Sequence, residues 1–90
     1  MRSRLHELYV MEASRVMKAH RADSDLSFAE LARRMREDYG IEIDAQSLRN
    51  KLNRGTLSLA YAMMLLDAMG VRTLKIPDLK NTPQARGERW

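Results

Sequence analysis

The fold is decided by residues 26–71, LSFAELARRMREDYGIEIDAQSLRNKLNRGTLSLAYAMMLLDAMGV. Three glycines, each able to end a helix in a left-handed conformation, divide this stretch into three runs of helix-forming residues: Gly40, Gly55 and Gly70. A polar residue suited to the N-cap position precedes each run: Ser27, Asp44, and either Thr56 or Ser58. The sequence therefore predicts short helices over residues 28–39, 45–54 and 59–69.

A longer helix is expected before this core. Residues 3–22 contain no glycine or proline, and their apolar side chains recur every three or four residues, as on one face of a helix. Val10 and Met11 widen that face, so it is either a broad core contact or a dimer seam. The fold class that follows is all-α, a bundle of four to five helices with a long N-terminal helix.

The domain is expected to span residues 1–76. Val71–Ile76 is apolar enough to pack back on the bundle or to form a short edge strand. Residues 77–90 are expected to be a flexible basic tail with a solvated Trp90. The methionines of the last helix, Met63, Met64 and Met69, are interpreted as core filling.

Length and composition exclude several classes of protein. The 90 residues include no cysteine, and no apolar run approaches the roughly 18 residues that a membrane helix needs. We expect a cytoplasmic protein, and a homodimer because so small a core gains from assembly, with the first helix or the Val71–Ile76 segment at the seam. His6 and His20 are too far apart on one helix to share a metal, and there is no glycine-rich phosphate loop. We therefore expect no enzyme activity, no cofactor, no metal and no small-molecule ligand.

The charge is unevenly distributed along the chain. The total of 16 basic and 12 acidic residues gives a net charge of +4. Residues 23–44 are strongly acidic, whereas residues 45–66 carry Arg49, Lys51 and Arg54 and no carboxylate. A concentrated basic segment favours a nucleic-acid partner more than a modest overall surplus does, although a solvated helix face is the simpler interpretation.

The core also carries motifs of a known class. Glu30-Leu31-Ala32 in its first helix, Arg54-Gly55 closing the second and Gly70-Val71 closing the third resemble the lambda-repressor-like (XRE-type) helix-turn-helix DNA-binding domains. Lys51-Leu52-Asn53-Arg54-Gly55 also resembles the signature of a small bacterial helix-turn-helix family. The resemblance implies a small bacterial or phage-type transcriptional regulator that binds double-stranded DNA as a homodimer on a palindromic operator. The chain departs from the pattern in the long Tyr39–Asp44 connection, in the four-residue spacing of Leu48 and Leu52, and in Asn53, where glutamate is common.

The second core helix can be analysed without the resemblance. At 100° per residue, Ala45, Leu48 and Leu52 share one side of the helix. The opposite side carries amides and a guanidinium, groups that pair with adenine and guanine edges in the major groove. We expect the base-reading residues to be Gln46, Asn50, Asn53 and Arg54. We expect the residues that hold the DNA backbone to be Ser27, Ser47, Arg49 and Lys51.

Two other functions remain open. The chain could be a protein-interaction module that kept the helical scaffold but lost the groove-reading face. RNA binding is a third option, for which Phe28, Tyr39 and Trp90 are the available stacking residues.

One feature of the sequence opposes a phosphate contact at Ser27. Asp23 and Asp25 lie just before Ser27, and their carboxylates would repel a phosphate bound at that residue unless they point away.

Overall fold

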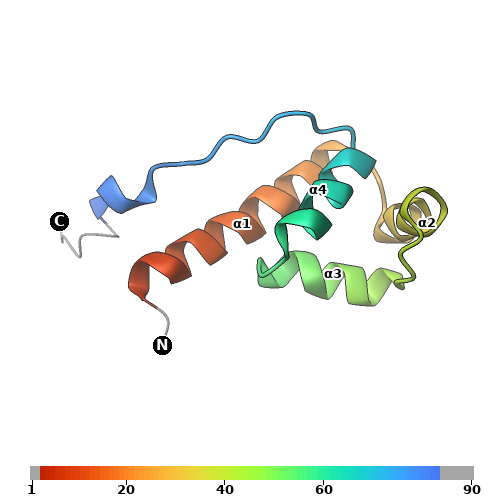
Figure 1. The fold of residues 1–90 in the computed structure, drawn as a ribbon, viewed down its shortest axis with the longest axis horizontal. Coiled ribbons are helices and arrows are strands. Elements are labelled where there is room, and N and C mark those ends of the chain that lie inside the picture. The colour runs from red at the N-terminus through yellow and green to blue at the C-terminus, as the bar shows by residue number, and fades with distance from the viewer. Residues whose placement is uncertain (1–2, 84–90) are drawn as a thin grey trace.

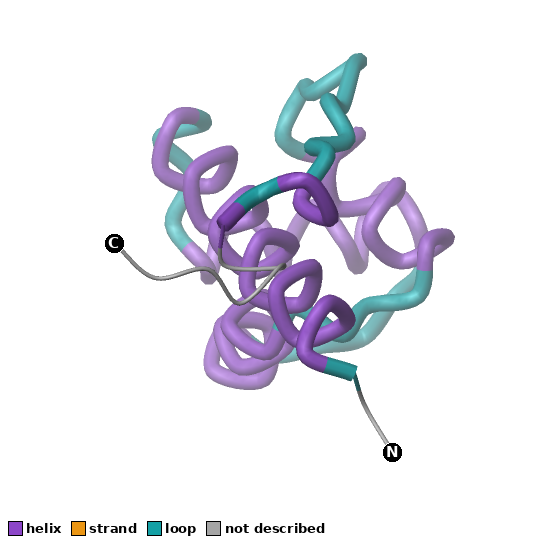
Figure 2. Tube along the Cα trace, turned by 90° about the vertical axis from the view of Figure 1, so that its left-hand side faces the viewer, coloured by secondary structure: helices purple, strands orange, loops and turns teal. Residues whose placement is uncertain are grey.

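The computed structural model describes residues 3–83, which form an all-helical fold (Figure 1). The elements are α1 (Arg4–Asp23), α2 (Phe28–Tyr39), α3 (Ala45–Arg54), α4 (Leu59–Ala68) and the short 3₁₀ helix η1 (Leu79–Asn81). Helices and loops alone make up the described chain in Figure 2, where a strand would be orange. The predicted fold class is confirmed, and α2 and α3 have the predicted bounds. Residues 71–76 are extended and form no edge strand.

Side-chain caps fix where the three core helices begin. The side chains of Ser27, Asp44 and Ser58 each accept a hydrogen bond from the backbone N–H three residues further on. The spacing of Ser27 and Glu30 predicts a reciprocal capping box, but this forms only in part. The Glu30 carboxylate binds Arg33 instead of reaching back to the cap. The N-cap hydrogen bonds thus set where the helices begin. The ion pair of Glu30 with Arg33 replaces the second hydrogen bond of the capping box.

The core lies where α2, α3 and α4 meet. Its fully buried large side chains are Leu31, Met35, Leu48, Leu52 and Leu65. Helix α1 adds Met17 and packs mainly against α3, while α2 packs against both α3 and α4. The interpretation of Met63 as core filling is wrong, because its residue surface is 60% exposed. Helix α4 is apolar on nearly every side, so periodicity could not tell its buried face from its exposed one.

The C-terminal end of α3 lies directly against the backbone of α1. Gly55 ends α3 with φ of 67°, and a Cβ there would overlap the Val10 carbonyl oxygen and lie 2.9 Å from the Ser14 amide nitrogen. The buried Ser14 hydroxyl donates to the Asn53 carbonyl oxygen at 2.9 Å. This close approach, which only glycine permits, fixes α3 in relation to the long helix.

Residues 71–83, here called the C-terminal strap, run back along α1 (Figure 1). The Tyr9 hydroxyl donates to the Pro77 carbonyl oxygen at 3.1 Å and accepts from the Leu79 N–H at 3.2 Å. The first part of the expected tail is therefore held against α1, and Trp90 lies outside the described residues. Within residues 3–83, no helix combines the length and the apolar character needed to cross a membrane.

Candidate nucleic-acid interface

The candidate site is the outer face of α3, which faces solvent because the leucines on the opposite side of the helix are buried. Leu48 and Leu52 are fully buried, as the helical wheel predicts, so the opposite side of α3 faces solvent. All four predicted base-reading side chains are exposed: Gln46, Asn50, Asn53 and Arg54. The Gln46 side-chain amide donates to the Asn50 amide oxygen at 3.2 Å, which aligns these two side chains along the helix.

The cations of α3 are not paired with any carboxylate of the described chain. Within residues 3–83, Arg49, Lys51 and Arg54 take part in none of the ion pairs of the structure. Relative to Asn50 on the outer face, Arg49 and Lys51 lie about 100° to either side of the helix axis. A helix in the major groove has a phosphate backbone on each side, so the two cations occupy the positions that such contacts require.

Arg49 is held beside the start of α2. Its guanidinium lies 4.8 Å from the centre of the Phe28 ring, and the guanidinium of Arg21 lies 4.6 Å from the same centre. Arg21 also donates to the Leu26 carbonyl oxygen at 2.9 Å. Ser27, the N-cap of α2, is exposed next to this pair, and its hydroxyl oxygen accepts from the Glu30 N–H at 3.0 Å. Two cations and a helix N-terminus therefore gather on one flank of α3.

Lys51 is held on the other flank, beside α4. Its ammonium group lies 5.1 Å from the centre of the Tyr61 ring. A polar pocket of about 220 Å³ opens there, between the end of α3 and the start of α4, and its lining includes Lys51, Arg54, Thr56 and Ser58. The Tyr61 hydroxyl is buried without a hydrogen-bond partner in the described chain, and burial raises its pKa. Both flanking cations are thus positioned over aromatic rings rather than neutralised by acids.

Two of the predicted residues lie in less open surroundings. The Ser47 hydroxyl donates to Asp44 at 3.1 Å, and hydrogen bonds from Ser47 lower the pKa of that carboxyl group. A phosphate at Ser47 would meet this carboxylate. Asn53 lies beside α1, in a depression lined by Ser14 and Lys18 among others. Arg54 lines the same depression. Around the helix axis, Gln46 and Arg54 lie about 40° from Asn50 and Asn53 lies about 60° from it, so Gln46, Asn50 and Arg54 are the outermost positions of the predicted set.

Sequence reasoning missed Arg21 and Tyr61. Arg21 belongs to α1 and reaches Phe28 only because the turn at residues 24–27 brings the start of α2 back beside it. The one available signal was an aromatic residue directly after a predicted N-cap. Asp23 and Asp25 are exposed at this turn, and Asp25 adopts the left-handed φ of 60°.

The described residues offer little sign of a metal centre. Within residues 3–83, no group of three or more histidine, aspartate or glutamate side chains is placed to hold a metal ion. His6 is exposed near the start of α1, and His20 is half-buried near its end.

A family model described as "Domain of unknown function (DUF6471)" matches residues 9–74. The chain belongs to this family. The matched residues run from the first half of α1 to the beginning of the strap and include the whole of α2, α3 and α4. No curated protein and no solved structure matches the chain. The family domain therefore contains the complete outer face of α3 with both flanking cations.

Proposed function

We propose that this protein binds double-stranded DNA sequence-specifically through α3. The observation that carries the proposal is the outer face of that helix. Exposed amides and Arg54 lie there between two flanking cations that pair with no carboxylate of residues 3–83. A solvated helix face usually mixes acidic and basic side chains. The outer face of α3 between Ala45 and Arg54 carries basic, amide and hydroxyl groups and no carboxylate.

The outer side chains have the chemistry of base readers. Amide groups such as Asn50 pair in a bidentate manner with adenine edges, and a guanidinium such as Arg54 pairs with guanine edges. Asn50 and Arg54 are four residues apart, so both reach the same groove from one helix. The hydrogen bond between Gln46 and Asn50 orders the amides before DNA arrives, which lowers the entropic cost of binding.

The flanking groups supply the phosphate contacts. Arg49, with Arg21 and the N-terminus of α2, serves one backbone, and Lys51 at the pocket beside α4 serves the other. Phosphate contacts position the helix and contribute most of the non-specific affinity.

A single ten-residue helix reads only a few base pairs, so one copy distinguishes few sites. Two copies related by a two-fold axis read two half-sites and need a palindromic operator. The proposed role is accordingly that of a small helix-turn-helix transcriptional regulator, acting as a homodimer in the cytoplasm.

The test is selection of bound sequences from a random duplex pool, followed by titration of the selected site at several salt concentrations. We expect one enriched motif with two-fold symmetry. Its affinity should fall steeply with salt, by a logarithmic slope of about −0.9 for each phosphate contacted. A scrambled duplex of equal length is the matched control and should bind at least about a thousandfold more weakly. A pool without enrichment, together with no salt-dependent binding, would leave the protein-interaction scaffold as the better description.

A further inference from the structure

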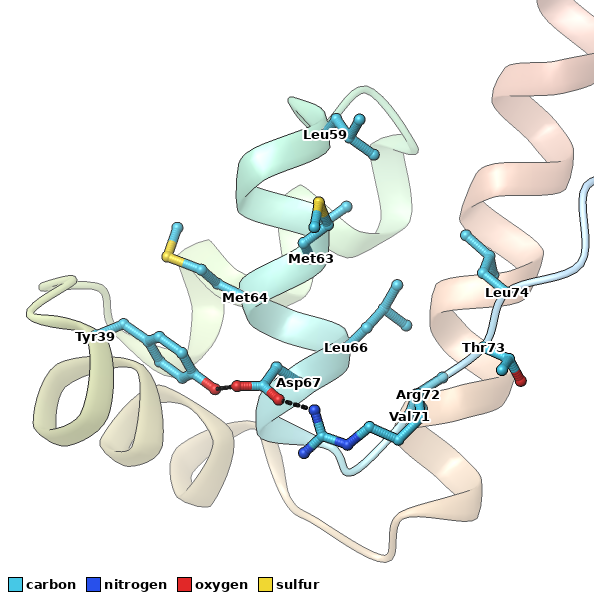
Figure 3. A pocket seen from close by; sticks show the side chains of 11 residues that line it. Tyr39, Leu59, Met63, Met64, Leu66, Asp67, Val71, Arg72, Thr73 and Leu74 are labelled. Carbon is cyan, nitrogen blue, oxygen red and sulfur yellow. Dashed lines mark hydrogen bonds and ion pairs between the residues drawn. The ribbon is translucent and has the colours of Figure 1, made fainter.

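Helix α4 and the strap carry an apolar face that is separate from α3. Residue exposure is 73% at Leu59 and 60% at Met63 on α4, and 43% at Leu74 and 73% at Ile76 on the strap. Between α4 and the strap lies an open groove of about 550 Å³, to which Leu59, Met63 and Leu74 all contribute (Figure 3). We call this surface the α4–strap face.

We propose that the α4–strap face binds the same face of a second copy of this chain. This inference rests on the proposed function, which requires two copies on one operator, and it names the surface that joins them. A two-fold pair needs a surface complementary to itself, in which each contact occurs twice. Leu59 and Met63 line the groove from α4 and remain largely exposed, so they can contact the same residues of a second copy across a two-fold axis.

The charges that line the groove suit a partner identical to itself. Among residues 3–83, the charged residues that line the groove are Asp67 and Arg72, and they form an ion pair with each other. The Tyr39 hydroxyl donates to the second oxygen of Asp67 (Figure 3), and this bond raises the pKa of Tyr39 to about 12. Within the described part of the chain, the groove therefore presents no unpaired charge that would repel its own copy.

The exposed apolar area supplies part of what one side of a dimer interface buries. At roughly 60–120 Å² of apolar surface per large aliphatic side chain, the four exposed residues offer about 150–300 Å². The half-buried groove residues Met64 and Val71 add to this area. One side of a standard interface buries about 800 Å², of which somewhat more than half is apolar. The α4–strap face supplies a large share of that apolar part.

The alternative seam on α1 has a different character. Met11 is the large apolar residue of α1 that stands out, at 66% exposure. Its surroundings include Lys18 and the exposed ion pair of Arg15 with Glu12. No residue that lines the groove belongs to α3, and Figure 1 shows α3 along the lower edge of the molecule with α4 above it. Pairing through α4 and the strap therefore leaves both copies of the α3 face available to DNA.

The decisive measurement is sedimentation velocity of the full chain, from about 1 to 100 µM, a range in which weak and moderate dimers dissociate. The test variant is Met63→Glu and the matched control is Met11→Glu, since both replace an exposed helical methionine by a carboxylate. We expect a wild-type dimer, at least about tenfold weaker association for Met63→Glu because its charge enters the seam twice, and no change for Met11→Glu. A monomeric wild type over the whole range overturns the proposal. A wild-type dimer that Met11→Glu dissociates and Met63→Glu does not would also overturn the proposal.

DNA binding keeps the two proposals distinguishable. Circular dichroism should show that Met63→Glu retains its helical content, because the side chain is exposed. That variant should bind a single half-site as well as the wild type does, but lose at least about tenfold in affinity for the full palindrome. Conversely, Asn50→Ala should dimerise normally. If Met63→Glu breaks the dimer and no DNA sequence is bound, the interface stands and the DNA proposal fails.

Discussion

Helices α2 and α3 are built alike and differ in what their exposed faces carry. Both begin at a side-chain cap and end at a left-handed glycine. On α2, Arg33 forms ion pairs with Glu30 and Glu37, so carboxylates of its own helix neutralise the Arg33 charge. On α3, the cations contact aromatic rings or solvent and meet no carboxylate within residues 3–83. The comparison shows that the placement of carboxylates, and not the helical architecture, separates a supporting helix from a candidate reading helix.

The two C-terminal glycines provide the largest expected contrast. Gly40 and Gly55 have almost the same φ, 71° and 67°, but a Cβ at Gly40 meets nothing within 4 Å, whereas one at Gly55 overlaps the backbone of α1. Gly40→Ala should cost about 1–2 kcal/mol, the price of a left-handed non-glycine residue. Gly55→Ala should cost about 1–3 kcal/mol more, because α3 must move away from α1. Urea denaturation of both variants measures the difference, and equal losses would show that the close approach to α1 is not needed.

The next contrast lies within α3. Asn50→Ala should weaken binding to the selected DNA site by about 1–3 kcal/mol and relax the preference at one base position. Asn53→Ala should have a clearly smaller effect, because Asn53 lies beside α1 and about 60° around the helix axis from Asn50. Both variants should melt within a few degrees of the wild type, since both side chains are exposed. Fluorescence anisotropy with the site and its single-base variants measures both effects, and wild-type affinity for Asn50→Ala would remove the base-reading role.

Salt dependence compares a cation of α3 with one of α2. Lys51→Ala should weaken binding to all sequences alike and reduce the salt slope by about one unit for each copy bound, because one phosphate contact is lost. Arg33→Ala should leave the slope unchanged, because Arg33 is already committed to two carboxylates of its own helix. The measurement is affinity for specific and scrambled duplexes over a series of salt concentrations. Equal slope changes in the two variants would mean that the ion pairs of α2 do not withhold its cations from DNA.

The smallest expected effect concerns acid and the two N-caps. Hydrogen bonds from Ser47 keep the pKa of Asp44 in the folded state below its unfolded value of about 3.9. The stabilisation by this cap is therefore complete above about pH 4 and is lost as the pH falls through the lower, folded pKa. Asp44→Asn keeps a good cap without a titrating group, so stability should fall less between pH 4 and pH 2 than in the wild type. The control Ser27→Asn exchanges one neutral cap of α2 for another and should leave the pH dependence unchanged. Thermal melts across this pH range measure the loss. An equal loss of stability in the wild type and in Asp44→Asn would show that the Asp44 carboxylate does not cause the pH dependence.

Local sequence was enough to predict much of the fold. The bounds of α2 and α3 and the caps at Ser27 and Asp44 follow from short-range preferences, because each depends on residues within one turn. The buried positions of Leu48 and Leu52 follow from helical periodicity. What the sequence did not predict depends on contacts between distant segments.

Three features illustrate that limit. The exposure of Met63 depends on which side of an almost uniformly apolar helix meets the core, and helical periodicity cannot identify that side. The stacking of Arg21 and Arg49 on Phe28 joins three helices through one turn. The candidate site itself was found from sequence because all its outer residues lie on one helix. The contacts of its flanking cations with the rings of Phe28 and Tyr61 were not predicted, because these two residues lie on α2 and α4.

The hydrogen bonds of Tyr9 have a consequence for the order in which the chain folds. They join residues separated by 68 and 70 positions, which closes almost the whole described chain into one loop. Closing so long a loop costs more entropy than any contact within or between α2 and α3, so docking of the strap belongs to the last step of folding. Tyr9→Phe would remove these bonds from the native state without slowing the nucleation of the helical core. Its effect would be faster unfolding, with the folding rate almost unchanged.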